Sequence, residues 1–215
     1  MQQGRFIVFE GGEGVGKTTQ VPLLVKALAQ AGLSTRTERE PGGTALGETI
    51  RPILKSHHYP EINEWHALCG YNFSRMAYLF EVVKPTLSQG QWLVSDRFAF
   101  STIVYQGYAG GLPPEVVEAV TNGVVGSYWP DITFILDMPA AESLARRNAD
   151  QGDGTRYEEM DMSFHNKVRE GYLHLHEKNP HNTAVINATQ PQNVVHRAIL
   201  TELNTRFALN LQPVI

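Results

Sequence analysis

Short apolar runs alternate along the chain with longer segments in which apolar residues recur at helical spacing. The run Arg5–Glu10 (RFIVFE) is unbroken and rich in β-branched and aromatic residues, which is typical of a strand buried on both faces. In the next segment, Thr18–Ala31, apolar residues return every three or four positions until Gly32, as they do in an amphipathic helix. Ile132–Asp137 (ITFILD) has the clearest strand pattern of the chain.

The same two patterns account for most of the remaining sequence. Further strands are predicted at Leu33–Glu40, Gln91–Ser95 and Thr183–Asn187. Further helices are predicted at about Ala45–Lys55, Glu64–Leu87, Pro114–Gly126, Ala140–Asn148, Glu159–Lys178 and Gln192–Phe207. Strands that alternate with helices in one chain form a parallel sheet with helices on both faces. We therefore predict a three-layer α/β fold with a five-stranded parallel sheet, in one domain spanning residues 1–215.

Composition and charge narrow the class of protein. The chain has 215 residues, 42% of them hydrophobic and 19% charged, which is ordinary for one well-buried globular domain. The formal net charge of -4 argues against sequence-independent binding of nucleic acid, which needs a clustered basic excess. The single cysteine, Cys69, cannot form an intramolecular disulfide, and no apolar run is long enough to cross a bilayer. These features predict a soluble cytoplasmic protein that binds neither nucleic acid nor a membrane.

A complete phosphate-binding motif lies between the first predicted strand and the first predicted helix. Residues 11–18 read Gly-Gly-Glu-Gly-Val-Gly-Lys-Thr, which fits G-x-x-x-x-G-K-[ST]. The glycines let backbone N–H groups surround a β-phosphate at the helix N-terminus, Lys17 reaches the β and γ oxygens, and the Thr18 hydroxyl is a Mg²⁺ ligand. We predict that ATP with Mg²⁺ binds here, on Gly11, Gly12, Glu13, Gly14, Val15, Gly16, Lys17 and Thr18.

Two charged residues follow the third predicted strand. Asp96 comes directly after that strand, where P-loop enzymes have a carboxylate that supports Mg²⁺ directly or through water. A strand-terminal Asp also caps helices, which is the alternative. Asp137 ends another strand and competes for this role, but the Met-Pro after it favours a helix cap. We predict Asp96 and Thr18 as metal ligands. Arg97 lies where open α/β sheets bind their ligands, at the carboxyl end of a central strand.

Residues 39–44 read Arg-Glu-Pro-Gly-Gly-Thr, and Asp96-Arg97 is followed, eight residues after Arg97, by Tyr-Gln-Gly. These two segments are close to diagnostic of the bacterial thymidylate kinase family, which the chain resembles from the first predicted strand to the last helix. The resemblance implies a P-loop nucleoside-monophosphate-kinase fold, transfer of the γ-phosphoryl group of ATP to dTMP, and a homodimer. The matching residues are Phe9–Gly11, Arg39–Thr44, Asp96-Arg97, Ser101, Thr102, Tyr105–Gly107, Pro130-Asp131, Leu136-Asp137 and Asn187–Pro191.

The resemblance also implies an acceptor site. Arg97 would grip the monophosphate, and Arg75 would hydrogen-bond the thymine edge. Tyr71, four residues before Arg75 on a predicted helix, would stack on the base, although family members usually have Phe there. Arg51 would reach the base side, unless it is a solvated helix charge. The implied substrate-binding residues are Glu40, Arg51, Tyr71, Arg75, Arg97, Ser101, Thr102, Tyr105 and Gln106.

A lid is implied at about residues 147–158. Family members with Glu in the P-loop, here Glu13, supply an arginine from the lid that closes over the ATP phosphates. Arg156 matches this arginine because it precedes Tyr-Glu, whereas Thr155 stands where Asp is common. Arg146 and Arg147 are the alternatives. Lys17, Arg97 and Arg156 are therefore the predicted catalytic residues.

Two other functions fit the P-loop alone. One is a P-loop kinase that acts on another nucleotide or a deoxynucleoside. The other is an NTP-driven switch that binds a protein partner instead of phosphorylating a metabolite. A GTPase needs an N-K-x-D segment to read guanine, and the sequence has none.

Overall fold

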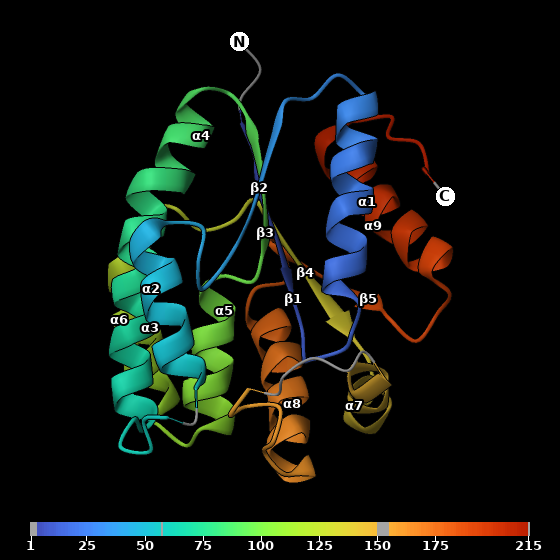
Figure 1. The fold of residues 1–215 in the computed structure, drawn as a ribbon. Helices are drawn as coiled ribbons and strands as arrows, with labels where there is room; N and C mark the ends of the chain where they lie inside the picture. Colours follow the sequence, from blue (N-terminus) through green and yellow to red (C-terminus); the bar gives the residue numbers. More distant parts are fainter. Residues whose placement is uncertain (1–3, 57, 150–154, 215) are drawn as a thin grey trace.

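A five-stranded parallel sheet forms the centre of the protein in the computed structural model (Figure 1). The structure describes residues 4–56, 58–149 and 155–214. The strand order is β2-β3-β1-β4-β5, and neighbouring strands run parallel. The strands are β1 (Phe6–Glu10), β2 (Thr35–Arg39), β3 (Trp92–Asp96), β4 (Ile132–Asp137) and β5 (Thr183–Asn187). The α/β fold with five parallel strands, predicted from the sequence, is confirmed.

Helices cover both faces of the sheet. On one face lie α1 and α9, and on the other lie α8 and the helical layer from α2 to α6 (Figure 1). No helix in the described part of the chain is long and apolar enough to cross a membrane. The helices are α1 (Lys17–Gln30), α2 (Ala45–Lys55), α3 (Glu64–Tyr78), α4 (Lys84–Ser88), α5 (Ala99–Thr102), α6 (Pro114–Val125), α7 (Ala140–Ala149), α8 (Met162–Lys178) and α9 (Gln192–Phe207), with π-helical segments η1 (Leu79–Val83) and η2 (Ile103–Ala109).

Strand β1 explains why its sequence is apolar without a break. Ile7 and Phe9 face the core under α1 and α9, whereas Phe6 and Val8 face the core formed with α3 and η1. Successive side chains of a strand point to opposite faces, so a strand with helices on both sides needs apolar residues at every position. Glu10, the last residue of β1, is the exception, because it is polar and fully buried.

The helices differ from the prediction in two places. The predicted helix Glu64–Leu87 is continuous, but it contains the π-helical segment η1 between α3 and α4. The segment 99–109, α5 and η2, was not predicted to be helical. Its residues Ile103, Val104 and Tyr105 favour strands, but η2 packs against α6 and α8, and this tertiary packing overrides local propensity.

The register of the sheet brings the polar strand ends together. Asp96 pairs with Phe9 of β1 on one side and with Arg39 of β2 on the other. The segments that follow β1, β2 and β3 therefore leave the sheet at the same carboxyl edge, where open α/β folds bind their ligands.

Candidate active site

The loop between β1 and α1 depends on glycine for its close contacts. Gly11 has φ +135, and a Cβ there would lie 2.6 Å from the carbonyl oxygen of Leu136. Gly14 has φ +72, and a Cβ there would collide with the carbonyl oxygen of Ser143. Side chains are excluded at both positions, because the loop packs closely against Leu136 at the end of β4 and Ser143 in α7. The glycines of the P-loop motif permit this close packing.

Lys17 is held against this loop. Its Nζ donates to the carbonyl oxygens of Gly11 at 3.1 Å and Gly12 at 2.6 Å. Burial, with the nearby charge of Arg97, lowers the pKa of Lys17 to about 8. The ammonium is therefore poorly solvated and close to Arg97, and a bound phosphate would relieve both of these costs.

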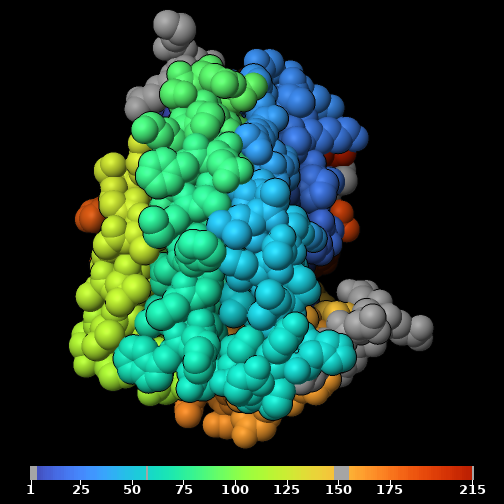
Figure 2. Space-filling model, turned by 60° about the vertical axis from the view of Figure 1, so that its left-hand side comes forward, coloured from blue at the N-terminus to red at the C-terminus, as the bar shows by residue number. Residues whose placement is uncertain are grey.

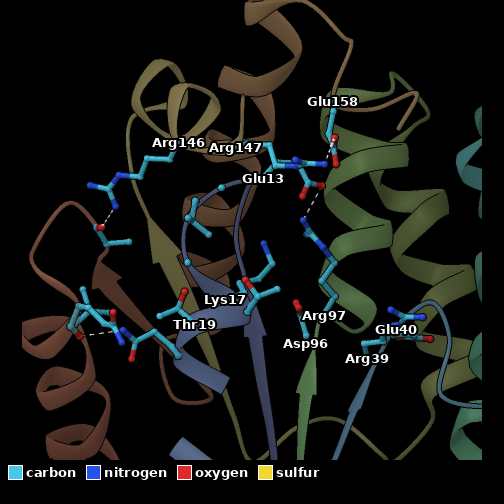
Figure 3. A pocket seen from close by; sticks show the side chains of 18 of the residues that line it. Glu13, Lys17, Thr19, Arg39, Glu40, Asp96, Arg97, Arg146, Arg147 and Glu158 are labelled. Atoms are coloured by element: carbon cyan, nitrogen blue, oxygen red, sulfur yellow. Dashed lines mark hydrogen bonds and ion pairs between the residues drawn. The ribbon is translucent and has the colours of Figure 1, made fainter. Parts of the chain in front are cut away.

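A cavity of about 690 Å³ opens beside the loop (Figure 3). Its lining includes Lys17, Thr18 and Asp96, which were predicted to bind ATP and Mg²⁺, together with Arg97 and Arg51. Four further residues come from α7 and the segment near the start of α9. They are Arg146, Arg147, Gln190 and Gln192.

The oxygens of Thr18 and Asp96 are suited to a magnesium ion. Thr18 is exposed to the cavity, and Asp96 has one carboxylate oxygen, Oδ1, that is buried without a hydrogen-bond partner among the described residues. Mg²⁺ usually takes one or two protein oxygens and completes its shell with water and substrate phosphates, so this donor set fits it. No group of three or more His, Cys, Asp or Glu residues in the described chain could hold a metal ion by itself. Asp137, the competing carboxylate, is occupied by Arg169 in a pair of hydrogen bonds of 2.7 and 2.9 Å.

Arg97 stands at the junction of the site in an unusual backbone conformation. Its φ is 71, in the left-handed region that costs a non-glycine residue about 1–2 kcal/mol. The conformation is held by the Arg97 N–H, which donates to Phe9 O at 2.8 Å, and by Ser95 Oγ, which donates to Arg97 O at 2.8 Å. Its guanidinium donates to Gly11 O, Glu13, Ser101, Tyr105 and Tyr172 at 2.8 to 3.3 Å.

Glu13 of the P-loop faces this arginine (Figure 3). Burial alone would raise the pKa of Glu13, but the charges of Arg97, Lys17 and Lys55 outweigh it and hold the pKa well below its usual range. The carboxylate is therefore ionised at neutral pH and balances part of the positive charge.

A second cavity adjoins the first and shares Glu13, Glu40, Lys55 and Arg97 with it. It brings together eight of the nine residues predicted to bind the acceptor, and Arg51, the ninth, lines the larger cavity instead. The eight are Glu40, Tyr71, Arg75, Arg97, Ser101, Thr102, Tyr105 and Gln106.

Arg75 is a buried cation that is held by several partners and keeps one guanidinium N–H without a partner among the described residues. Its side chain is only 3% exposed, and its Nε lies 3.1 Å from Oε2 of Glu40. It also donates to Asn72 Oδ1 at 3.0 Å and to Thr102 Oγ1 at 2.9 Å. Burial raises the pKa of Glu40, and the Arg75 charge opposes this. The guanidinium is thus fixed in direction before any ligand arrives.

The hydroxyl that distinguishes Tyr71 from the usual Phe has a neighbour. Burial first, and then the Tyr157 hydroxyl, raise the pKa of Tyr71 well above its ordinary value. Tyr157 also accepts a hydrogen bond from Gln106 at 2.9 Å. The tyrosine at this position therefore belongs to a polar cluster beside the second cavity.

Sequence reasoning assigned no role to several residues of the site. Glu10 is fully buried and accepts hydrogen bonds from Phe98 N, Ser101 N, Ser101 Oγ and Tyr172 OH at 2.7 to 3.1 Å. Burial raises its pKa. The sequence signal that could have identified Glu10 is its position as a carboxylate at the end of an otherwise apolar strand. Lys55, at the end of α2, lines both cavities but had no motif around it, and burial lowers its pKa to about 8.

The predicted lid arginine lies away from the larger cavity. Arg156 donates to Ile62 O at 2.7 Å and Glu64 Oε1 at 3.0 Å, next to the second cavity. Arg147 lines the larger cavity, where its Nη2 lies 3.0 Å from Glu158 Oε2 (Figure 3). Part of the predicted lid segment, residues 150–154, lies outside the described residues.

Comparisons with known proteins agree on one family. The family model for thymidylate kinase matches residues 9–199. A thymidylate kinase from Methylococcus capsulatus is 38% identical over 208 residues, 97% of this chain and 99% of that protein. One from Chlamydia trachomatis is 43% identical over 190 residues, 86% of this chain and 92% of that protein. The solved structure of thymidylate kinase from Ehrlichia chaffeensis has a TM-score of 0.76 and 32% identity, and covers 94% of this chain and 99% of that chain.

Proposed function

Because this chain belongs to the thymidylate kinase family, we propose that it transfers the γ-phosphoryl group of ATP to dTMP, giving dTDP and ADP. The observation that carries the proposal is the pair of adjoining cavities that share Arg97. One cavity contains the P-loop with Lys17, and the other contains the buried Arg75. A phosphoryl donor and a nucleotide acceptor bound in these cavities would meet at Arg97.

The chemistry requires positioning more than proton transfer. The acceptor is already an anionic phosphate, so no strong general base is needed. Lys17 would bind the β and γ phosphate oxygens of ATP, and Arg97 would bind the acceptor phosphate with its planar fork. Both cations are partly removed from water, which strengthens their attraction for the charge of the transferred group.

Magnesium is part of the proposal. Thr18 and Asp96 would hold the ion at the larger cavity, Asp96 either directly or through water. The chemistry supplied there would be neutralisation of the phosphate charge during transfer.

The second cavity is suited to a pyrimidine with a carbonyl group. The Arg75 guanidinium only donates hydrogen bonds, so it favours a carbonyl oxygen over an amino group at the base edge. Tyr71 is only 8% exposed beside it and offers a ring on which the base would stack. Tyr105, over which the Arg97 guanidinium lies at 5.3 Å, would flank the sugar.

A homodimer is also proposed. Large apolar side chains are exposed along α3 and η1, at spacings of three to eight residues that keep them near one face. Figure 2 shows the surface that these helices form with α2 and α6, and those neighbours add Ile53 and Val120. The exposed residues on α3 and η1 are Trp65, Phe73, Met76 and Phe80.

The deciding experiment is ADP release with ATP, Mg²⁺ and each nucleoside monophosphate in turn. We expect dTMP to be the best acceptor and dUMP a poorer one, because one methyl group is worth only about 1 kcal/mol. We expect dCMP and the purine monophosphates to be much poorer acceptors than either. If cytidine or purine monophosphates are preferred, the protein is a P-loop kinase that acts on another nucleotide. If ATP is hydrolysed at a rate that dTMP does not change, the result favours an NTP-driven switch protein.

A further inference from the structure

Four side chains beside the acceptor cavity form a closed hydrogen-bond cluster. Gln106 Nε2 donates to Glu64 Oε2 and to the Tyr157 hydroxyl, both at 2.9 Å. Arg156 Nη2 lies 3.0 Å from Glu64 Oε1 and 2.5 Å from the same hydroxyl. Gln106 is 1% exposed, and its Oε1 has no partner among the described residues. One buried acceptor is thus left over on a residue that lines the acceptor cavity.

The neighbours of Gln106 decide which way its amide lies. An amide oxygen and an amide nitrogen have the same shape, so only their partners distinguish them. The Glu64 carboxylate accepts hydrogen bonds and donates none, and the Arg156 guanidinium donates and accepts none. Reversing the amide would bring its oxygen to within 2.9 Å of a carboxylate oxygen, acceptor against acceptor. The nitrogen therefore faces Glu64, and the oxygen is left for a ligand.

The hydrogen bonds of Tyr157 agree with this orientation of the Gln106 amide. Its oxygen accepts from Arg156, which can only donate, and from Gln106. The Tyr157 hydroxyl itself donates to Glu64 Oε2, and the two oxygens lie 3.5 Å apart. Both hydrogens of the Gln106 amide nitrogen are then used within the cluster.

The fold holds Glu64 firmly in this place. Glu64 is the first residue of α3, and Asn63 before it caps the helix by accepting from Trp65 N at 3.0 Å and His66 N at 3.2 Å. A carboxylate in the first helical turn is also favoured by the helix dipole. A side chain on a rigid element can fix a neighbour more closely than one on a loop.

We propose that Glu64 is a positioning residue that sets the hydrogen-bonding polarity of Gln106, so that the acceptor site selects a base with an N–H donor. The inference rests on the proposed function. Thymine and uracil have a donor at N3, which would satisfy the free Oε1, whereas cytosine has an acceptor at N3. An unpaired buried acceptor, or two acceptors face to face, is costly, so the cluster rejects cytosine.

The test compares kcat/KM for dTMP, dUMP and dCMP in three proteins, the unchanged chain, Glu64→Gln and Glu61→Gln. Glu64→Gln keeps the shape but lets residue 64 donate, so the Gln106 amide can turn over. We expect the dTMP-to-dCMP ratio to fall about tenfold in Glu64→Gln, with the dTMP-to-dUMP ratio unchanged because both bases have the N3 donor. Glu61→Gln, which removes an exposed charge just before the same helix, is expected to keep both ratios.

Failure of the inference is separable from failure of the proposed function. If the unchanged chain does not phosphorylate dTMP, the proposed function fails before Glu64 is tested. If it does, and Glu64→Gln keeps the dTMP-to-dCMP ratio, the role of Glu64 is overturned. Should Glu64→Gln not fold, as judged by its melting transition, Glu64→Asp replaces it. Its shorter carboxylate withdraws from Gln106, so the same ratio should fall, and an unchanged ratio again overturns the inference.

Discussion

Arg97 Nη2 donates to Glu13 Oε1 across 2.8 Å, so the P-loop carboxylate and the guanidinium at the end of β3 form an ion pair between the two cavities. Arg97 keeps further donors on Gly11 O and Ser101 Oγ, which fix its direction. Glu13 also accepts from Tyr105 at 3.2 Å. The pair holds the guanidinium ready without leaving its charge unbalanced, and an acceptor phosphate would take over part of this balance.

The first prediction concerns this arginine. Arg97→Ala should lower kcat/KM for dTMP by about 10³-fold, because it removes the cation that would bind the acceptor phosphate next to the transferred group. An arginine at a phosphoryl-transfer centre contributes this much or more. Arg97→Lys should recover little, since an ammonium cannot match two phosphate oxygens at once. Steady-state kinetics provide the measurement, with Arg197→Ala on the exposed side of α9 as the control. Wild-type kinetics in Arg97→Lys would mean that only charge is needed.

The second prediction concerns Lys17. Lys17→Ala should abolish turnover with dTMP and ATP while changing the melting temperature little, because among the described residues the ammonium donates hydrogen bonds only to loop carbonyls. An activity assay and a thermal melt on the same sample measure the turnover and the melting temperature. Near-normal turnover in a folded Lys17→Ala protein would end the P-loop assignment.

How far the place of a residue could be predicted depends on how local its sequence signal is. The position of Lys17 and Thr18 beside the larger cavity was predictable because the P-loop motif is contiguous and lies between a strand and a helix. The position of Asp96 there was predictable because β3 ends at this residue. Glu64 and Gln106, which meet across 42 positions of the sequence, carry no local pattern, and their contact arises only when η2 packs beside α3. The helix over residues 99–109 was missed for the same reason.

The third prediction is a pH dependence. Burial lowers the pKa of Lys17, and separately of Lys55, to about 8. Both are cationic below that pH and lose their protons as the pH rises through it, so phosphate binding weakens on the alkaline side. We expect kcat/KM for ATP to fall above about pH 8, with a weaker effect on kcat, because bound phosphate stabilises the ammonium.

Lys55→Met separates the two lysines. The alkaline decline should persist in this variant if Lys17 causes it. Loss of the decline in Lys55→Met would assign it to Lys55 instead. A profile that stays flat to pH 9.5 would contradict the lowered pKa of both residues.

The fourth prediction tests the homodimer. Phe73 is 54% exposed and Phe80 is 64% exposed on the proposed contact surface. Phe73→Glu should convert a dimer to a monomer in sedimentation velocity, because an unpaired charge in a buried interface is strongly unfavourable. Val194→Glu, at an exposed apolar position on α9, should leave the dimer intact. A monomer in the unchanged chain would refute the proposal directly.

The last prediction separates the arginines around the lid. Arg147 lines the larger cavity with one ion-pair partner, Glu158, so little is lost when it turns toward a phosphate. Arg156 is the lid arginine that the family resemblance implies. It donates hydrogen bonds to Ile62 O, Glu64 and the Tyr157 hydroxyl, and it must break all three to reach ATP. In the described arrangement Arg156 supports the acceptor side. We therefore expect Arg147→Ala to lower kcat at least about tenfold. Arg156→Ala should mainly raise the KM for dTMP, because it loosens Glu64 and Gln106.

Full kinetics on Arg146→Ala, Arg147→Ala and Arg156→Ala, with both substrates varied, distinguish these assignments. The Arg146 guanidinium donates hydrogen bonds to Glu142 and to the carbonyl of Ala188. Its removal should therefore act chiefly on ATP binding at the edge of the larger cavity. A loss of kcat in Arg156→Ala with wild-type kcat in Arg147→Ala would show that Arg156 crosses to the phosphates when ATP and dTMP are bound. That result would uphold the family resemblance, and it would also mean that Glu64 gives up its counter-ion during each catalytic cycle.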